Sequence, residues 1–103
     1  MEIRLTEKAV KEQVLRIWLR RIPEESGILH AYQVKKLRPD QLVGTTTLYG
    51  RGPDSSAQER TMLFIKLVPR SQSDRLSVGD LIEIRIEAKD GLQAVEFDVL
   101  EVE

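Results

Sequence analysis

The strongest constraint on the fold is an alternation of apolar and polar side chains on both sides of Asp90-Gly91. Asp-Gly is a preferred pair for a two-residue hairpin turn. Counting outward from that turn sets three isoleucines opposite three apolar partners: Ile86 with Val95, Ile84 with Phe97, and Ile82 with Val99. A slip of one residue would move every one of these side chains to the other face. The pattern therefore predicts an antiparallel hairpin with one buried face in the last third of the chain.

Three earlier segments, residues 28–36, 42–50 and 61–68, also have the composition or alternation of strands. Either face of the first could be the inner one. In the second, Gly44 indicates a β-bulge, and residues 38–41, which include a proline, predict a turn before it. The third is expected to bury its leucines and isoleucine and to point Met62, Phe64 and Lys66 outward.

Residues 1–22 show the spacing of a helix instead. Thr6 has the character of an N-cap, and four apolar residues then recur on one helical face: Val10, Val14, Ile17 and Trp18. Glu12 and Arg16 have the spacing of an i,i+4 ion pair. A proline and a glycine shortly after residue 22 are expected to end the helix.

One helix followed by about five strands, joined by turns rather than by helical crossovers, argues against a parallel βαβ architecture. The predicted fold class is α+β, mainly β, with an N-terminal α-helix followed by a five-stranded antiparallel small barrel. A single domain is expected over residues 1–103, with the helix in residues 1–22 and the barrel in residues 28–103.

The composition excludes several classes of site. The chain has no cysteine and a single histidine, His30, so neither a metal site nor a cofactor is expected. No serine lies in a nucleophile motif, and no glycine-rich phosphate-binding loop occurs, so no enzymatic activity is expected. Apolar runs are too short for a signal peptide or a membrane span, which predicts a cytoplasmic protein without a membrane partner.

The net charge of −1 conceals an uneven distribution along the chain. Residues 1–38 contain nine basic and five acidic side chains, whereas residues 76–103 contain two basic and eight acidic ones. Only the first third could attract a polyanion. The same polarity supports an alternative function, a protein–protein interaction or assembly module in which the basic N-terminal helix meets an acidic C-terminal hairpin.

The outward pair Phe64 and Lys66 is the main candidate binding site. Single-stranded nucleic acid is commonly held by aromatic rings that stack on bases and by cations that meet phosphates. The aromatic surface could be extended by Tyr32 and Tyr49, and the positive charge by three hairpin residues, Lys35, Lys36 and Arg38. The structural alternative is that Phe64 lies under the N-terminal helix and that Lys66 is simply solvated.

From Met62 onward the chain resembles the second half of a cold-shock domain. The similarity rests on MLFIKL (62–67), LSVGDLIEIRIE (76–87) and DGLQAV (90–95). The resemblance implies an oligonucleotide-binding (OB) barrel in which Phe64 matches a base-stacking phenylalanine and Lys66 stands where the family usually has histidine. Tyr32 loosely matches an aromatic of the first strand. The family's Lys-Gly-Phe-Gly-Phe motif is missing, and Leu92 replaces the proline of its Gly-Pro-Gln-Ala turn, so a divergent OB-like barrel is the better description.

A second resemblance is to the PilZ domain, a small barrel that binds cyclic di-GMP. Arg16 and Arg20 have the Arg-x-x-x-Arg spacing of that family, but its Asp-x-Ser-x-x-Gly motif is absent. This resemblance implies a PilZ-like cyclic-nucleotide-binding barrel as a further alternative. A charged, solvated helix face is the simpler explanation of the two arginines.

Overall fold

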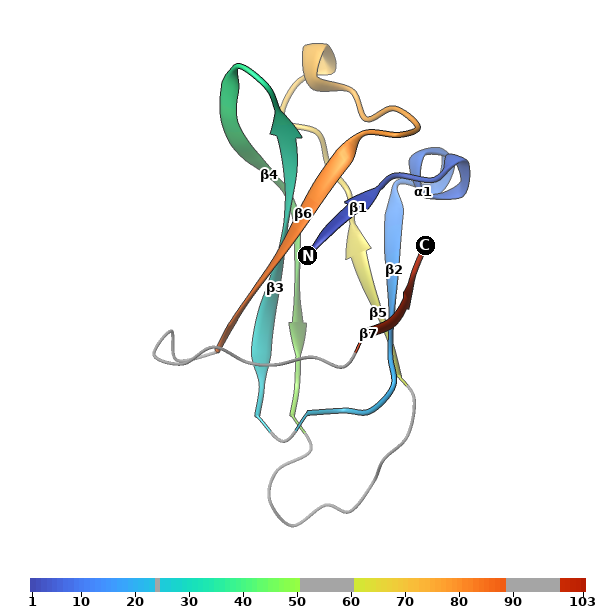
Figure 1. The fold of residues 1–103 in the computed structure, drawn as a ribbon, viewed down its shortest axis with the longest axis vertical. Coiled ribbons are helices and arrows are strands. Elements are labelled where there is room, and N and C mark those ends of the chain that lie inside the picture. Colours follow the sequence, from blue (N-terminus) through green and yellow to red (C-terminus); the bar gives the residue numbers. More distant parts are fainter. Residues whose placement is uncertain (24, 51–60, 89–98) are drawn as a thin grey trace.

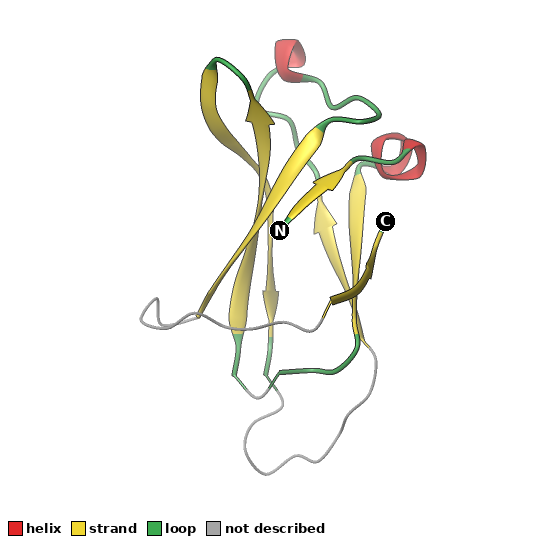
Figure 2. Ribbon diagram, viewed as in Figure 1, coloured by secondary structure: helices red, strands yellow, loops and turns green. Residues whose placement is uncertain are grey.

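The computed structural model describes residues 1–23, 25–50, 61–88 and 99–103, and these form seven strands, one α-helix and one 3-10 helix (Figures 1 and 2). The elements follow one another as β1 (Glu2–Arg4), α1 (Glu7–Glu12), β2 (Val14–Leu19), β3 (Gly27–Lys35), β4 (Arg38–Leu48), β5 (Thr61–Lys66), the 3-10 helix η1 (Gln72–Asp74), β6 (Leu81–Ala88) and β7 (Val99–Val102). The described part is mainly β, as the sequence predicts.

The strands form two antiparallel sheets. One has the order β1-β6-β3-β4 and the other the order β5-β2-β7. Figure 1 shows the first sheet beside the second, with α1 and the β5–β6 connection near one end of both. Strands β4 and β5 also approach each other, because the backbone N–H of Val68 donates to the carbonyl of Val43 over 2.7 Å. The described strands thus curl around one core. They do not show the closed five-stranded barrel that the sequence predicts.

The inner faces of both sheets supply the core. The largest fully buried side chains come from β2, β3, β5 and β6 and from the segments that flank them: Leu5, Leu15, Ile17, Leu19, Leu29, Ile65, Leu67 and Ile82. Burial alternates strictly along β2 and along most of β3. This alternation resolves the face of β3 that the sequence left open, since Leu29, Ala31 and Gln33 point inward.

The long N-terminal helix predicted for residues 1–22 is wrong. The helix covers only Glu7–Glu12, and Gln13 ends it in the left-handed conformation with φ 56°. Thr6 is the predicted N-cap, accepting a hydrogen bond from the Ala9 N–H over 3.1 Å. Residues 14–19 form the central strand of the second sheet, where hydrogen bonding to β5 and β7 outweighs the local helical spacing. Val14 and Trp18 therefore do not lie on a helical face.

The predicted pairing of the last third is only partly within the described residues. Strand β6 forms, but its Ile82 lies between Ile3 of β1 and Gln33 of β3, and Val99 pairs with Leu19 of β2. The predicted pair of Ile82 with Val99 is therefore wrong, because both edges of β6 are occupied there. The turn at residues 90–91 and the partners expected at residues 95 and 97 lie outside the described residues.

Strand β4 differs from its prediction at one end and matches it at the other. The turn lies at residues 36–37, and residues 38–41, expected as a turn, already belong to β4. Pro39 is tolerated there because β4 is an edge strand of its sheet. The predicted bulge is confirmed, since Ala31 pairs with Gly44 and Tyr32 with Leu42, which leaves Val43 as the extra residue.

Candidate nucleic-acid interface

Strand β5 points Phe64 and Lys66 away from the core, as the alternation predicts. Both residues are exposed, whereas Leu63 and Ile65 are buried. Phe64 keeps 51% of its surface accessible. Among the described residues the ring therefore does not lie under α1, and the interpretation of Phe64 as a residue covered by the helix is wrong.

Strand β2 supplies the neighbours of this pair. In the β2–β5 register, Arg16 lies opposite Phe64, Val14 opposite Lys66, and Trp18 opposite Met62. All three β2 residues are half-buried and alternate with the core residues of the strand. We call the outward set the aromatic–basic face; it consists of Val14, Arg16, Trp18, Met62, Phe64 and Lys66.

Arg16 connects this face to the end of α1. Its guanidinium carbon lies 5.6 Å from the centroid of the Phe64 ring, within the range of a cation–π interaction. A guanidinium nitrogen of Arg16 also lies 2.5 Å from a carboxylate oxygen of Glu12. The predicted ion pair therefore exists, although it crosses the junction of α1 and β2 instead of lying within one helix. Arg16 is the first arginine of the motif that resembles a cyclic di-GMP site. Because Glu12 already pairs with it, its charge is not available to an anionic ligand.

Trp18 is the member of the face that the sequence reasoning placed elsewhere. The helical spacing predicts that it packs inward with Val10 and Ile17. As a strand residue it points to the side opposite Ile17, onto the face that carries Phe64. The signal that could have identified it is the alternation of three buried residues, Leu15, Ile17 and Leu19, around it.

Acidic side chains border the aromatic–basic face along β7. Glu101 lies opposite Trp18, and the backbone of Glu103 exchanges two hydrogen bonds of 2.8 Å with that of Arg16. The Glu103 carboxylate lies 3.5 Å from the ammonium of Lys8. The positive side of the face is therefore its β5 edge, where Lys66 is exposed.

Tyr32 lies on a different sheet from Phe64. It points outward from β3, where the Arg85 guanidinium carbon lies 4.2 Å from the centroid of its ring. Arg85 in turn pairs with Asp40 at 2.5 Å and with Glu83 at 3.0 Å. The hydrogen bond and charge of Arg85 lower the pKa of Glu83. The structure thus gives Tyr32 a role in a charged cluster on the four-stranded sheet and does not join it to Phe64.

Tyr49, the other tyrosine of the predicted surface, follows the end of β4 and is 71% exposed. The adjacent backbone is fixed by Ser26, whose hydroxyl accepts a hydrogen bond from the Gly50 N–H over 2.8 Å. Tyr49 belongs to neither β2 nor β5 and so lies outside the aromatic–basic face as defined here.

Two of the three predicted hairpin cations already have an acidic partner. The Lys35 ammonium and the Arg38 guanidinium donate to the same oxygen of Asp74, over 2.7 Å and 3.0 Å. Hydrogen bonds from Lys35 and Ser71 and the two nearby positive charges lower the pKa of Asp74, so that it stays ionised. Lys36 is exposed at the turn. Of the three cations predicted to extend the positive charge, chiefly Lys36 therefore remains available.

His30 is placed as a structural residue. Its Nε2 lies 3.7 Å from a carboxylate oxygen of Glu87, and its ring centroid is 6.2 Å from that of Tyr32. In the described ranges, His, Asp and Glu side chains form no group of three that could hold a metal ion. No helix among these residues is both long and apolar enough to cross a bilayer.

Comparison of the chain with protein-family models, with curated proteins and with solved structures found no match.

Proposed function

We propose that this chain is a non-enzymatic binding module for single-stranded nucleic acid, with an OB-like barrel that binds through the aromatic–basic face. The observation that carries the proposal is the position of Phe64. Its ring is half exposed on a sheet surface, with Arg16 opposite it on β2 and Lys66 two residues along β5. Exposed aromatic rings on a sheet stack on bases without strong sequence preference, and flanking cations meet the phosphates.

The proposal assigns different parts to the residues of the face. Phe64 provides the stacking surface, and Trp18, diagonal to it across the β2–β5 pair, extends the apolar area. Lys66 contacts a phosphate beside the stacked base, whereas Arg16 stays paired with Glu12 and lies against the Phe64 ring. Lys35 and Arg38 contribute little, because Asp74 already neutralises them.

The direct test is titration of the protein with oligo(dT) and oligo(U), followed by the fluorescence of Trp18, the single tryptophan of the chain. A base that stacks on this face quenches the indole. Phe64→Ala should weaken binding by about 5- to 150-fold, which corresponds to a stacking contribution of about 1–3 kcal/mol. Anisotropy of a labelled oligonucleotide provides a second readout that does not depend on Trp18.

Leu42→Ala is the matched control. Leu42 is an exposed apolar residue of similar accessibility, 49%, but it lies on β4 in the other sheet. It should leave the affinity within about twofold of wild type. With one phosphate neutralised by Lys66, the logarithm of the binding constant should fall with the logarithm of salt concentration with a slope of about −0.7. Undetectable binding at low ionic strength, or equal losses for Phe64→Ala and Leu42→Ala, would refute the proposal.

A further inference from the structure

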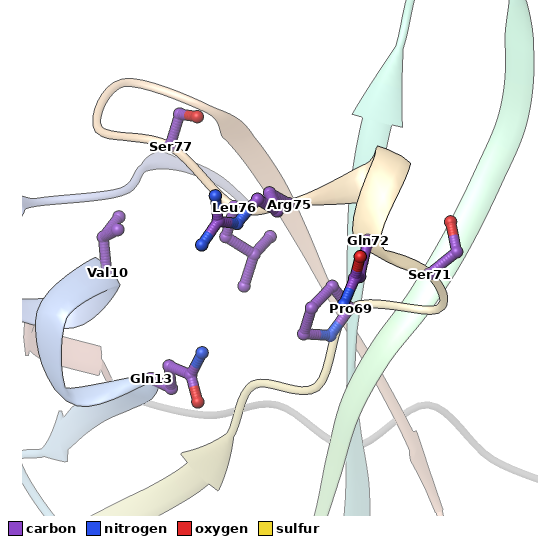
Figure 3. Close-up of a pocket in the computed structure, with 8 residues that line it drawn as sticks. All are labelled: Val10, Gln13, Pro69, Ser71, Gln72, Arg75, Leu76 and Ser77. Carbon is purple, nitrogen blue, oxygen red and sulfur yellow. The ribbon is translucent and has the colours of Figure 1, made fainter.

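A groove of about 810 Å³ lies at the end of the molecule where α1 meets the connection between β5 and β6 (Figure 3). Val10 and Gln13 line it from the α1 side, and six residues of the β5–β6 connection line it from the other side: Pro69, Ser71, Gln72, Arg75, Leu76 and Ser77. Its size is within the range of sites that bind small molecules. None of its lining residues belongs to the aromatic–basic face.

The groove carries an uncompensated positive charge. Arg75 is its single lining cation, and no acidic side chain lines it among the residues that the structure describes. The neighbouring carboxylate of Asp74 is turned to Lys35, Arg38 and Ser71 instead. Within the described ranges, no hydrogen bond or ion pair engages the guanidinium of Arg75, so its donors are available to a ligand.

Gln13 brings an amide to the same groove at a conformational cost. Its φ of 56° lies in the left-handed region, which glycine adopts more readily than other residues. Its N–H donates to the Ala9 carbonyl, and its own carbonyl accepts from the Leu67 N–H over 2.8 Å, so the backbone is fixed. Figure 3 shows its side chain directed toward the space that Arg75 faces. Glycine would satisfy the backbone here, so the glutamine contributes only its side chain.

The wall of the groove that contains Arg75 is anchored at both ends. Asp74 ties its start to the β3–β4 hairpin. Toward its end, the Gly79 N–H donates to the Leu5 carbonyl over 2.8 Å, and the Leu5 N–H donates to the backbone carbonyl of Asp80 over 2.9 Å. Such anchoring holds the groove open in advance of binding and lowers the entropic cost of binding.

Part of the remaining lining is apolar, and the other part consists of the polar residues Ser71, Gln72 and Ser77. Val10 and Leu76 are half-buried and pack against the core from the groove side, and Pro69 is half-buried beside them. A ligand that fits has one anionic group for one guanidinium and a short apolar part. A carboxylate has this charge and matches the planar fork of arginine in a bidentate manner.

We propose that this groove binds a small organic carboxylate. The carboxylate accepts two hydrogen bonds from Arg75 and one from the amide of Gln13, and the hydrocarbon part lies on Val10 and Leu76. The inference does not depend on nucleic-acid binding, because the two surfaces share no residue. Either proposal can fail while the other holds.

The test is a titration of the ¹⁵N-labelled protein with hexanoate and, in parallel, with the uncharged hexanamide. Hexanoate should shift the backbone amide resonances of residues 13 and 75–77, whereas hexanamide should bind at least about tenfold more weakly. Arg75→Gln should weaken hexanoate binding by about tenfold or more. Arg70→Gln is the matched control, because it removes the same charge from the same connection without removing a lining residue, and it should have little effect.

Gln13→Gly separates binding from folding. Glycine fits the left-handed backbone, so the melting temperature should be unchanged or higher while the affinity for hexanoate falls. Equal binding of hexanoate and hexanamide, or equal losses for Arg75→Gln and Arg70→Gln, would overturn the proposal. Tighter binding of inorganic phosphate than of hexanoate would overturn the assignment to carboxylates.

Discussion

At the scale of single residues, Asp74 links two parts of the fold that are distant in the sequence. It is 5% exposed and joins η1 to the β3–β4 hairpin through Lys35 and Arg38, which precede it by 39 and 36 positions. A buried carboxylate is stable only with such partners. The two cations that the sequence marked as binding residues therefore stabilise the fold.

The environment of Asp74 predicts acid sensitivity. Its pKa is lowered from 3.8, first by the hydrogen bond from Lys35 and then by that from Ser71. The unfolded chain therefore takes up this proton at a higher pH than the folded one. The resulting stabilisation is complete above about pH 5 and is lost as the pH falls through the lowered folded pKa.

We expect Asp74→Asn to lower the urea unfolding midpoint clearly at about pH 6 and to differ much less from wild type at about pH 3. Chemical denaturation at a series of pH values measures both. Glu101→Gln, which removes an exposed acid from β7, is the control and should shift the midpoint little at either pH. A pH-independent difference for Asp74→Asn would contradict the role assigned to its charge.

At the scale of elements, the segment 14–19 shows where local sequence patterns are insufficient. Its apolar residues fit a helix when counted from Val10 and fit a strand when counted from Leu15. The strand is favoured over the helix because β5 and β7, which are distant in the sequence, pair with β2. Alternation predicts which face of a strand is buried, but it does not predict which strand lies beside it.

Because alternation does not predict which strands are neighbours, only part of the candidate site could be predicted from the sequence. The outward direction of Phe64 and Lys66 followed from alternation along one strand. The position of Trp18 could not follow, because it depends on β2 being a strand. The pairing of Lys35 and Arg38 with Asp74 could not be predicted either, because Asp74 lies in a distant connection whose sequence has no periodicity.

The strand assignment makes a quantitative prediction for β2. Leu15 is 1% exposed and packs in the core, whereas Val14 lies on the outer face. Leu15→Ala should lower the free energy of unfolding by about 2–5 kcal/mol, and Val14→Ala by clearly less. The helical spacing would give the opposite order, since it places Val14 on the buried stripe. Urea denaturation of the two variants distinguishes the two outcomes.

The bulge in β4 makes a second prediction. A Cβ added at Gly44 would lie 2.5 Å from Cγ2 of Ile65 and 2.6 Å from the carbonyl oxygen of Lys66. The second of these atoms belongs to the backbone and cannot turn away. Gly44→Ala should therefore destabilise the fold by about 1–3 kcal/mol through overpacking between β4 and β5.

Gly79→Ala provides a contrasting control for Gly44→Ala. An added Cβ meets nothing within 4 Å there, and the strain comes only from its φ of 88°. The cost at this position should thus be that of the backbone alone, about 1–2 kcal/mol. A stabilising Gly44→Ala, measured by thermal or urea unfolding, would show that β4 and β5 do not approach as described.

At the scale of the whole molecule, the uneven charge along the chain is partly neutralised by the fold. The basic N-terminal part reaches the acidic C-terminal part within one chain, since Lys8 pairs with Glu103 and β7 adds to the sheet next to β2. Arg85, one of the two basic residues in the last 28, is held by Asp40 and Glu83. This internal pairing weakens the electrostatic attraction that would favour head-to-tail assembly between chains.

We therefore expect a monomer of 11.8 kDa at every salt concentration, measured by light scattering after size-exclusion chromatography from about 50 mM to about 500 mM salt. Among the described residues, four exposed apolar side chains come from different segments: Leu37 from the β3–β4 turn, Leu42 from β4, Phe64 from β5 and Val78 from the connection before β6. Lys8→Gln serves as the internal comparison. If it frees Glu103 to pair with another chain, a dimer should appear at low salt and dissociate at high salt. A wild-type dimer with that same salt dependence would instead favour the assembly module over the nucleic-acid-binding module, because it would show that the charges at the two ends of the chain act between molecules.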